Sequence, residues 1–331
     1  MWRWLPALLV IGCTEPRQGT VLRPGAAEVV APGPREVECG RQRAALGGVV
    51  DASVLLVVDR SSSMATGSRW TETRSAIADA IGTHDRHLRV GLLLYPSGRD
   101  VCDQVEAEAA VPIALDTGEA IGAALASADI FRGTPTGAAL RAAAELLAED
   151  PGDHRVVILA TDGRPDCTAQ GWDDGSGVAA TEAFDAADAL AEDGVPVYVV
   201  GIEGSAAARA VLNRLADIGG TARPGDVGYY ETTSGAELAR ALVDIALDVE
   251  GCSLRLDAHP EAVRMEVRLD GAPMAASDGW EVVDQRLRVS GAACLTSPGE
   301  VREVEVVWYC AEPAELKRDR AGSSGGGPAR P

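Results

Sequence analysis

Apolar and polar positions follow two different periods along this chain, and the change falls near Cys252. From Asp51 to about Glu250, short apolar runs alternate with Ala-rich stretches of helical spacing, which predicts strands and helices around a mostly parallel sheet. The expected strands are near-continuous runs of Val, Ile and Leu, as suits strands covered on both faces. They are residues 54–58, 90–95, 156–160 and 195–202.

The expected helices are rich in Ala, Leu, Glu and Arg. They are residues 71–81, 118–128, 137–148, 179–192, 206–216 and 235–249. Their order predicts a doubly wound α/β domain over residues 49–250.

Beyond Cys252, apolar and polar residues alternate, which predicts strands with one solvated face. The alternating segments are residues 263–269, 281–283, 286–289 and 304–308. The middle two flank Asp284-Gln285 and predict a hairpin. A unit of about 60 residues has a marginal core, where disulfides are usually recruited. We therefore expect a small, disulfide-linked β-rich domain over residues 251–312.

The flanking segments lack such periods. From Thr14 to about Gly48 the chain carries several Pro and Gly with little apolar periodicity, so residues 13–48 are expected to form a flexible tether. Residues 313–331 include a Ser- and Gly-rich run and are expected to be a disordered tail.

The first residues predict export. Arg3 precedes a short apolar run that ends at Gly12 and Cys13, which predicts a signal peptide over residues 1–12. A membrane-spanning or buried helix is the alternative, but a span needs about 20 apolar residues. The sequence Val10-Ile11-Gly12-Cys13 resembles the bacterial lipobox, which implies lipidation of Cys13. We therefore expect a lipid-anchored protein of the bacterial cell envelope. Thr14 after the lipidated cysteine favours the outer membrane, with periplasmic and surface faces both open.

The net charge of the chain limits the classes of partner that it is expected to bind. The formal net charge is −20 over 331 residues, which disfavours nucleic acid and anionic lipid surfaces and favours cations. Contact with the membrane is expected through the lipid anchor only.

Apart from Cys13, the chain has six cysteines, an even number. They are Cys39, Cys102, Cys167, Cys252, Cys294 and Cys310. In an exported chain they predict three disulfides. The absence of C-x-x-C spacing and the scattered histidines disfavour a zinc site or a thioredoxin-type motif.

Candidate chemistry gathers where expected strands end. The run Asp59-Arg60-Ser61-Ser62-Ser63 follows the first strand, Gly133-Thr134-Pro135-Thr136-Gly137 precedes a helix, and Thr161-Asp162-Gly163 follows residues 156–160. The first run has the D-x-S-x-S pattern of the von Willebrand factor type A family, and all three motifs occur in the order of that family. Over roughly residues 51–250 the chain therefore resembles that family. The resemblance implies a metal-ion-dependent adhesion site with these ligands: Asp59, Ser61, Ser63, Thr134 and Asp162.

The residue types suit this chemistry. Mg²⁺ prefers hard oxygen ligands and usually keeps some waters, so one or two carboxylates with hydroxyls form an appropriate set, and Mn²⁺ or Ca²⁺ are alternatives. Open α/β sheets bind ligands at the carboxyl ends of strands where strand order reverses. Each motif alone has another explanation: the serines or Thr136 cap helices, and Asp162-Gly163 forms a turn. Ser62 stands where the family often has Gly, which could strain the loop slightly.

Cys102 follows the second strand at the same sheet edge as Asp59, and Cys167 lies five residues after Asp162. We therefore expect a Cys102–Cys167 bridge, which leaves three arrangements for the other four cysteines. The acidic, Gly-rich loop of residues 166–177 is expected to be solvated, with partner selection or a second cation as alternatives.

The function expected is non-enzymatic: a binding or adhesion module whose ion engages an acidic residue of a protein partner. A metal-dependent hydrolase is the alternative, but no Ser-His-Asp order, G-x-S-x-G, H-E-x-x-H or Walker-type motif is present. A purely structural envelope scaffold is the third possibility.

Overall fold

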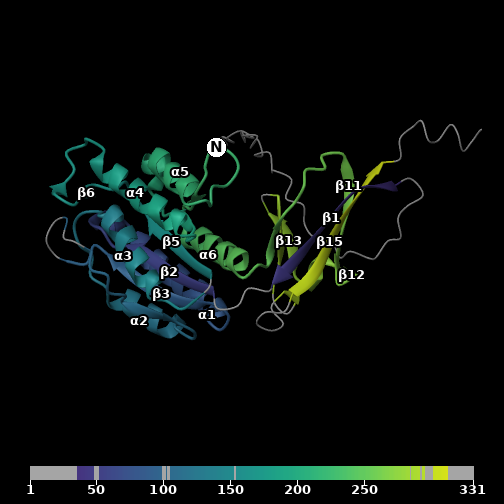
Figure 1. Ribbon diagram of the computed structural model, residues 1–331, viewed down its shortest axis with the longest axis horizontal. Helices are drawn as coiled ribbons and strands as arrows, with labels where there is room; N and C mark the ends of the chain where they lie inside the picture. The colour runs from purple at the N-terminus through teal and green to yellow at the C-terminus, as the bar shows by residue number, and fades with distance from the viewer. Residues whose placement is uncertain are drawn as a thin grey trace, which may run out of the picture.

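A computed structural model describes residues 36–47, 52–98, 102, 105–152, 154–283, 285–290, 293–294 and 301–311. Within these residues the chain forms an α/β body and a β-sandwich, which lie next to each other along the long axis of the molecule (Figure 1). The expected signal peptide, Cys13 and the tail of residues 313–331 lie outside the described residues.

The α/β body is built on a six-stranded sheet of order β4-β3-β2-β5-β8-β9. Its strands are β2 (Ala52–Asp59), β3 (Arg89–Tyr95), β4 (Val111–Ala114), β5 (His154–Thr161), β8 (Val197–Gly201) and β9 (Tyr230–Glu231). All pairs are parallel except β3 with β4. The mostly parallel α/β sheet predicted from the sequence is therefore confirmed, whereas the short edge strands β4 and β9 were not predicted.

Helices cover both faces of this sheet. On one face lie α1 (Arg69–His84), α2 (Gly118–Ser127) and α6 (Gly235–Val249). On the other lie α3 (Thr136–Ala148), α4 (Val178–Glu192) and α5 (Arg209–Ile218). Along β2, Leu56 and Val58 enter the first core, whereas Leu55 and Val57 enter the second. Because both sides of each strand are buried, the strand sequences are continuously apolar.

Strand order reverses between β2 and β5. The chain moves from β2 outward to β3 and β4, then returns to pair β5 with the other side of β2 and continues to β8. The carboxyl ends of β2 and β5 therefore meet at the topological switch point, which is where sheets of this class bind ligands.

The second body is a sandwich of two antiparallel sheets, of order β1-β15-β11-β12 and β10-β14-β13. The strands are β1 (Glu36–Gly47), β10 (Ser253–Arg255), β11 (Ala262–Leu269), β12 (Ala272–Met274), β13 (Trp280–Val283), β14 (Arg286–Val289) and β15 (Val301–Ala311). Leu46, Val267, Val306 and Trp308 belong to its core, as does Leu247 near the end of α6. The expected hairpin is present as β13 paired with β14.

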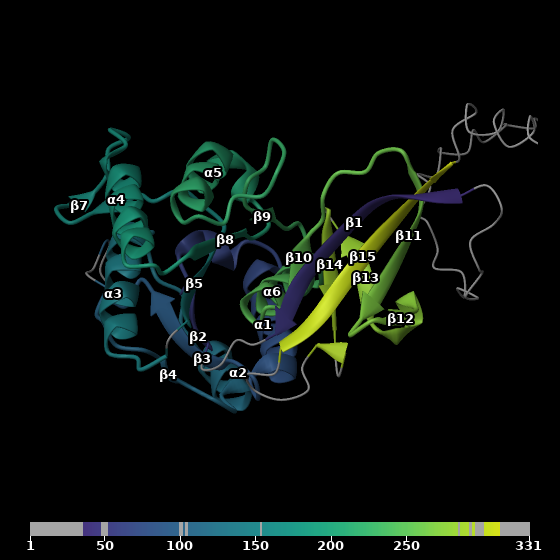
Figure 2. The ribbon, with the colours of Figure 1, turned by 45° about the vertical axis from the view of Figure 1, so that its right-hand side comes forward.

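The predicted flexible tether over residues 13–48 is wrong for Glu36–Gly47. These residues form β1, an edge strand that pairs along its length with β15 and hydrogen-bonds at Gly47 to the Gly251 carbonyl at 2.9 Å. The β-sandwich is therefore assembled from chain segments that precede and follow the α/β body in the sequence, not from the C-terminal segment alone (Figure 2). The strand was missed because its polar, Gly-containing sequence has weak local preference, and its pairing partner lies far along the chain.

Three disulfides join the described cysteines. The expected Cys102–Cys167 bridge is present, with an S–S distance of 2.05 Å. The other two bridges lie in the sandwich: Cys39–Cys310 joins β1 to β15, and Cys252–Cys294 lies in its core. Among the described helices none is long and apolar enough to cross a membrane.

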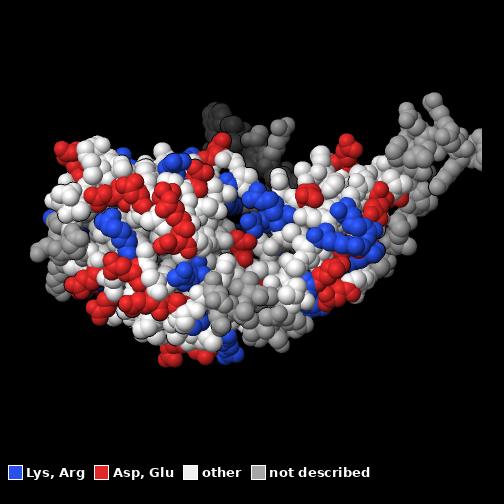
Figure 3. Space-filling view, viewed as in Figure 1, with Lys and Arg blue, Asp and Glu red and all other residues white. Residues whose placement is uncertain are grey.

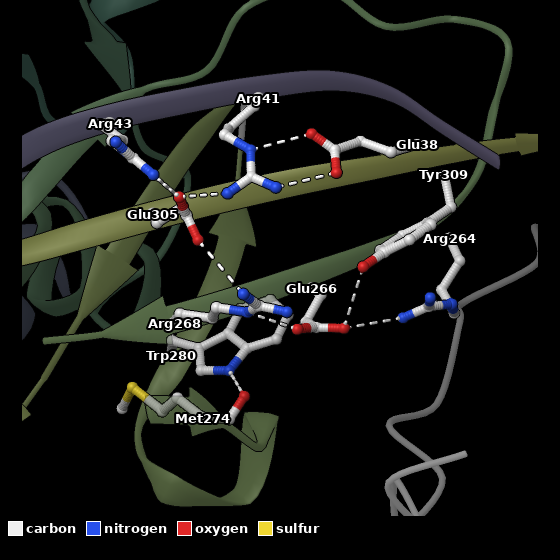
Figure 4. A network of polar contacts seen from close by, with 10 residues as sticks. All are labelled: Glu38, Arg41, Arg43, Arg264, Glu266, Arg268, Met274, Trp280, Glu305 and Tyr309. Atoms are coloured by element: carbon white, nitrogen blue, oxygen red, sulfur yellow. Dashed lines mark hydrogen bonds and ion pairs between the residues drawn. The ribbon is translucent and has the colours of Figure 1, made fainter. Parts of the chain in front are cut away.

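Charged side chains are distributed unevenly between the two bodies. On the face seen in Figure 3, acidic residues are spread over the α/β body, and basic residues gather toward the sandwich. A polar network on the outer face of the β1-β15-β11 sheet contains four arginines: Arg41, Arg43, Arg264 and Arg268 (Figure 4). There Glu305 accepts a hydrogen bond from Arg43 at 2.7 Å, and Arg268 donates to Glu266 at 2.6 Å. These pairs occupy the polar positions of the alternating pattern, where Glu305 is itself buried beneath its arginine partners.

Candidate metal site

The first part of the site is the turn that follows β2. Asp59 is the last residue of that strand, and its Oδ1 accepts a hydrogen bond from the Ser61 backbone N–H at 2.7 Å. A short 3₁₀ helix, Ser62–Ala65, then brings the Ser61 and Ser63 hydroxyl oxygens to 2.9 Å from each other. The strain anticipated at Ser62 is absent, because Ser62 is not among the residues with positive φ.

The loop after β5 meets this turn. Ser63 donates its hydroxyl hydrogen to Asp162 Oδ1 at 2.7 Å, although the two residues are 99 positions apart. Asp59, Ser61 and Asp162 are buried, whereas Ser63 is exposed. The two motifs therefore form one cluster of oxygen atoms that opens to solvent at Ser63.

The cluster concentrates negative charge in a buried place. Burial and the nearby charge of Asp162 raise the pKa of Asp59 to about 7. Thr161 opposes this effect, because its hydroxyl donates to Asp59 Oδ2 at 2.6 Å. Two neighbouring buried carboxylates are unfavourable without compensating cations. Arg69 supplies one positive charge at Asp162, so the site still suits a further positive ion.

Thr134 lies beside this cluster without hydrogen-bonding to it. It lines the same open depression as Ser63, but its backbone N–H donates to Asp166 Oδ1 at 2.6 Å. Burial raises the pKa of Asp166. The structure thus joins four of the five predicted ligands directly and places Thr134 at the edge of the same depression.

The Cys102–Cys167 disulfide supports the Thr134 loop. Gly133 has φ +88°, and a Cβ at this position would lie 2.6 Å from Cys167 Sγ. The loop therefore packs directly against the bridge, and glycine is needed both for its backbone conformation and for the close approach. Cys167 also starts the small hairpin of β6 (Cys167–Thr168) and β7 (Gly171–Trp172).

The rest of the loop of residues 166–177 is ordered by its own polar groups. Asp173 accepts hydrogen bonds from Ser176 Oγ at 2.7 Å and from the Ala179 backbone N–H at 3.0 Å, which fixes the chain before α4. Trp172 is 57% exposed and lines the depression next to Asp173 and Asp174. This loop therefore forms one wall of the depression.

Three residues that contact the predicted ligands were given no role from the sequence: Thr161, Asp166 and Arg69. Thr161 adjoins Asp162 and directly follows the strand expected over residues 156–160, so its position was an available signal. Arg69 pairs with Asp162 Oδ2 and donates to the Ser63 carbonyl at 2.8 Å. No sequence signal pointed to Arg69, because its contacts with Asp162 depend on how α1 meets β5 in the fold.

The donor set fits a hard divalent ion. It combines two carboxylates with hydroxyls, and no group of three or more His, Cys, Asp or Glu residues in the described segments is placed to hold a metal. Oxygen-only sets with few carboxylates suit Mg²⁺, Mn²⁺ or Ca²⁺ better than soft metals.

The comparison with protein families agrees with this architecture. The von Willebrand factor type A domain model matches residues 53–241, more than half of the chain. The chain belongs to the von Willebrand factor type A domain family. That match spans the sheet and the Asp59, Thr134 and Asp162 loops, and it stops before the sandwich strands β10 to β15.

Solved structures with a similar fold include three named proteins. The pilus adhesin SpaC from Lactobacillus rhamnosus GG is 15% identical, with a TM-score of 0.48, over 84% of this chain and 42% of SpaC. The von Willebrand factor domain of the type V pili tip protein Mfa5 from Porphyromonas gingivalis is 13% identical, with a TM-score of 0.46, over 61% of this chain and 95% of Mfa5. Proximal thread matrix protein 1 from the mussel byssus, with a zinc-occupied MIDAS motif, is 16% identical, with a TM-score of 0.44, over 62% of this chain and 47% of that protein. This chain thus spans less than half of SpaC. No curated protein matches the chain.

Proposed function

We propose that this protein is a non-enzymatic binding module of the bacterial cell envelope, in which a divalent cation at the Asp59 cluster engages a carboxylate of a protein partner. The observation that carries the proposal is the meeting of Asp59, Ser61, Ser63 and Asp162 at the switch point of the sheet. These residues come from two motifs of the family, so their convergence supports a shared role.

The ligand roles follow from donor type and from the resemblance to the family. Ser61 and Ser63 would bind the ion directly, Asp59 and Asp162 would supply negative charge directly or through water, and Thr134 would complete the set from the rim. Mg²⁺ is the expected ion, with Mn²⁺ and Ca²⁺ as alternatives. A bound ion would supply a positive centre that an acidic side chain of the partner can ligate. The depression beside Ser63 leaves space for such a side chain.

The proposed location rests on the leader sequence and the cysteines. Three disulfides suit an oxidising compartment, and the lipobox-like sequence ending at Cys13 favours a lipid anchor, with the outer membrane as the expected site. Mass spectrometry of the mature protein tests the anchor: a diacylated Cys13 at the N-terminus supports it, and an uncleaved or unlipidated chain contradicts it.

Calorimetric titration of the purified protein with Mg²⁺, Mn²⁺ and Ca²⁺ tests the ion site. We expect saturable one-site binding by the wild type and its loss in Asp59→Ala and in the shape-conserving Asp59→Asn. Asp217→Ala is the matched control, since Asp217 pairs with Arg214 on the exposed side of α5. Absence of binding by the wild type, or equal binding by Asp59→Ala, rejects the proposal.

A pull-down from envelope extract tests the partner. The wild type should retain a partner in the presence of the ion and release it on adding EDTA, whereas Asp59→Ala should retain none. A partner that binds both proteins equally would contradict cation-dependent recognition.

A further inference from the structure

An arginine already lies against the proposed ion site. Arg69 is the first residue of α1, and its Nη1 contacts Asp162 Oδ2 and donates to the Ser63 carbonyl at 2.8 Å. Only 12% of the Arg69 side chain is exposed, and the Asp162 side chain is fully buried. The guanidinium is thus placed at a carboxylate expected to serve the ion.

The surroundings of Arg69 leave room for the guanidinium in this position. Gly204, with φ +99°, faces it so closely that a Cβ there would lie 2.7 Å from Arg69 Nη2. A side chain at position 204 would therefore displace the guanidinium. Among the described residues, no other Lys or Arg side chain pairs with Asp59 or Asp162.

We propose that Arg69 is an internal counter-cation that competes with the divalent ion for Asp162. This inference rests on the proposed function and concerns the regulation of the same site. Without an ion, Arg69 compensates the buried charge of Asp162 and so stabilises the ion-free state. When an ion arrives, the same guanidinium repels it, and the ion has only part of the carboxylate charge available. Arg69 therefore lowers the affinity for the ion.

The competition also couples the ion to its partner. With Arg69 present, the ion and the guanidinium together exceed the charge of Asp59 and Asp162, so the loaded site is positive and attracts a carboxylate. Without Arg69, the loaded site is neutral. Because such coupling is reciprocal, a partner carboxylate strengthens ion binding in return. The ion is thus held more tightly once an acidic partner has bound.

Calorimetric titration with Mn²⁺ alone tests the inference in three variants. Arg69→Gln removes the charge and should bind Mn²⁺ at least ten-fold more tightly than the wild type. Arg69→Lys keeps the charge and should stay within about three-fold of the wild type. Arg74→Gln is the control on the same helix, because Arg74 donates to the Ala126 carbonyl away from the site, and it should match the wild type. In EDTA, Arg69→Gln should also melt at a lower temperature than Arg74→Gln.

The outcomes separate this inference from the proposed function. If the wild type binds Mn²⁺ and Arg69→Gln binds equally or more weakly, the counter-cation is rejected and the proposed function stands. If only Arg69→Gln binds, the counter-cation is supported and cation-dependent function of the wild type is contradicted. If neither binds, both are rejected.

Discussion

At the scale of single residues, the site depends on the proposed metal ligands and also on the groups that hold those ligands in place. Asp59 is fully buried, and its two carboxylate oxygens are held by different segments: the Ser61 backbone N–H on one side and the Thr161 hydroxyl on the other. A buried carboxylate that loses such a donor keeps its desolvation cost without compensation. Thr161 is therefore expected to stabilise the ion-free protein by holding Asp59.

Replacing Thr161 by Val removes this hydroxyl and nearly conserves the shape of the side chain. We expect the free energy of unfolding in EDTA to fall by about 1–3 kcal/mol, as measured by urea denaturation. Thr83→Val is the comparison, because the exposed Thr83 hydroxyl donates only to backbone carbonyls of its own helix, and its effect should stay within about 0.5 kcal/mol. An equal fall in the free energy of unfolding in the two variants would show that the contact with Asp59 stabilises the protein no more than an exposed helix hydroxyl does.

At the scale of secondary-structure elements, prediction from the sequence succeeded where local pattern and packing agree. The strands around β2, β3 and β5 were recognised because both of their faces are buried, so each is continuously apolar. The D-x-S-x-S turn and Asp162 were recognised by their resemblance to the motifs of the family, and both follow such strands. β1 could not be recognised, since only its distant partner β15 makes it a strand. The contact between Arg69 and Asp162 was equally invisible, because it depends on where α1 lies in space.

The Cys102–Cys167 bridge provides a prediction at this scale. The bridge joins two loops at the rim of the site, and Gly133 packs directly against it. The double variant Cys102→Ser/Cys167→Ser should lose about 2–4 kcal/mol of stability. It should also show faster hydrogen exchange at the Thr134 backbone amide, which then has a less constrained partner in Asp166.

The control for this variant removes a bridge in the other body. Cys252→Ser/Cys294→Ser should destabilise the sandwich and leave amide exchange at Thr134 unchanged, since that bridge lies in the sandwich core. Faster exchange at Thr134 in both double variants would contradict a local role for the rim bridge.

At the scale of the whole molecule, the α/β body is inserted between two strands of the sandwich. The chain leaves β1 at Gly47, builds the entire α/β body, and returns at Gly251, whose carbonyl accepts a hydrogen bond from the Gly47 N–H at 2.9 Å. Two ion pairs fasten α6 to β14, namely Arg288 to Asp244 at 2.6 Å and Arg286 to Asp248. Polar contacts therefore reinforce the two places where the chain passes between the bodies.

Deleting residues 1–47 tests the contribution of β1. The deletion removes Leu46 from the sandwich core and eliminates the Cys39–Cys310 bridge, so we expect the sandwich to unfold at a lower temperature in calorimetry while ion binding is retained. A chain lacking only residues 1–35 keeps β1 and should melt like the full protein. Identical melting of the two truncated chains would contradict a structural role for β1.

The pairing of β1 with β15 has a mechanical consequence. A pull between a partner held at the Asp59 cluster and an anchor upstream of Glu36 stretches β1 along its own axis. The load then passes along the β1 backbone, which is already extended and is held in place by its antiparallel pairing with β15 from Glu36–Ala311 to Gly47–Val301. The Cys39–Cys310 bond limits how far β1 can slide. Tension of this kind would therefore be carried by the covalent chain of β1, and the sandwich would not have to unfold to transmit it.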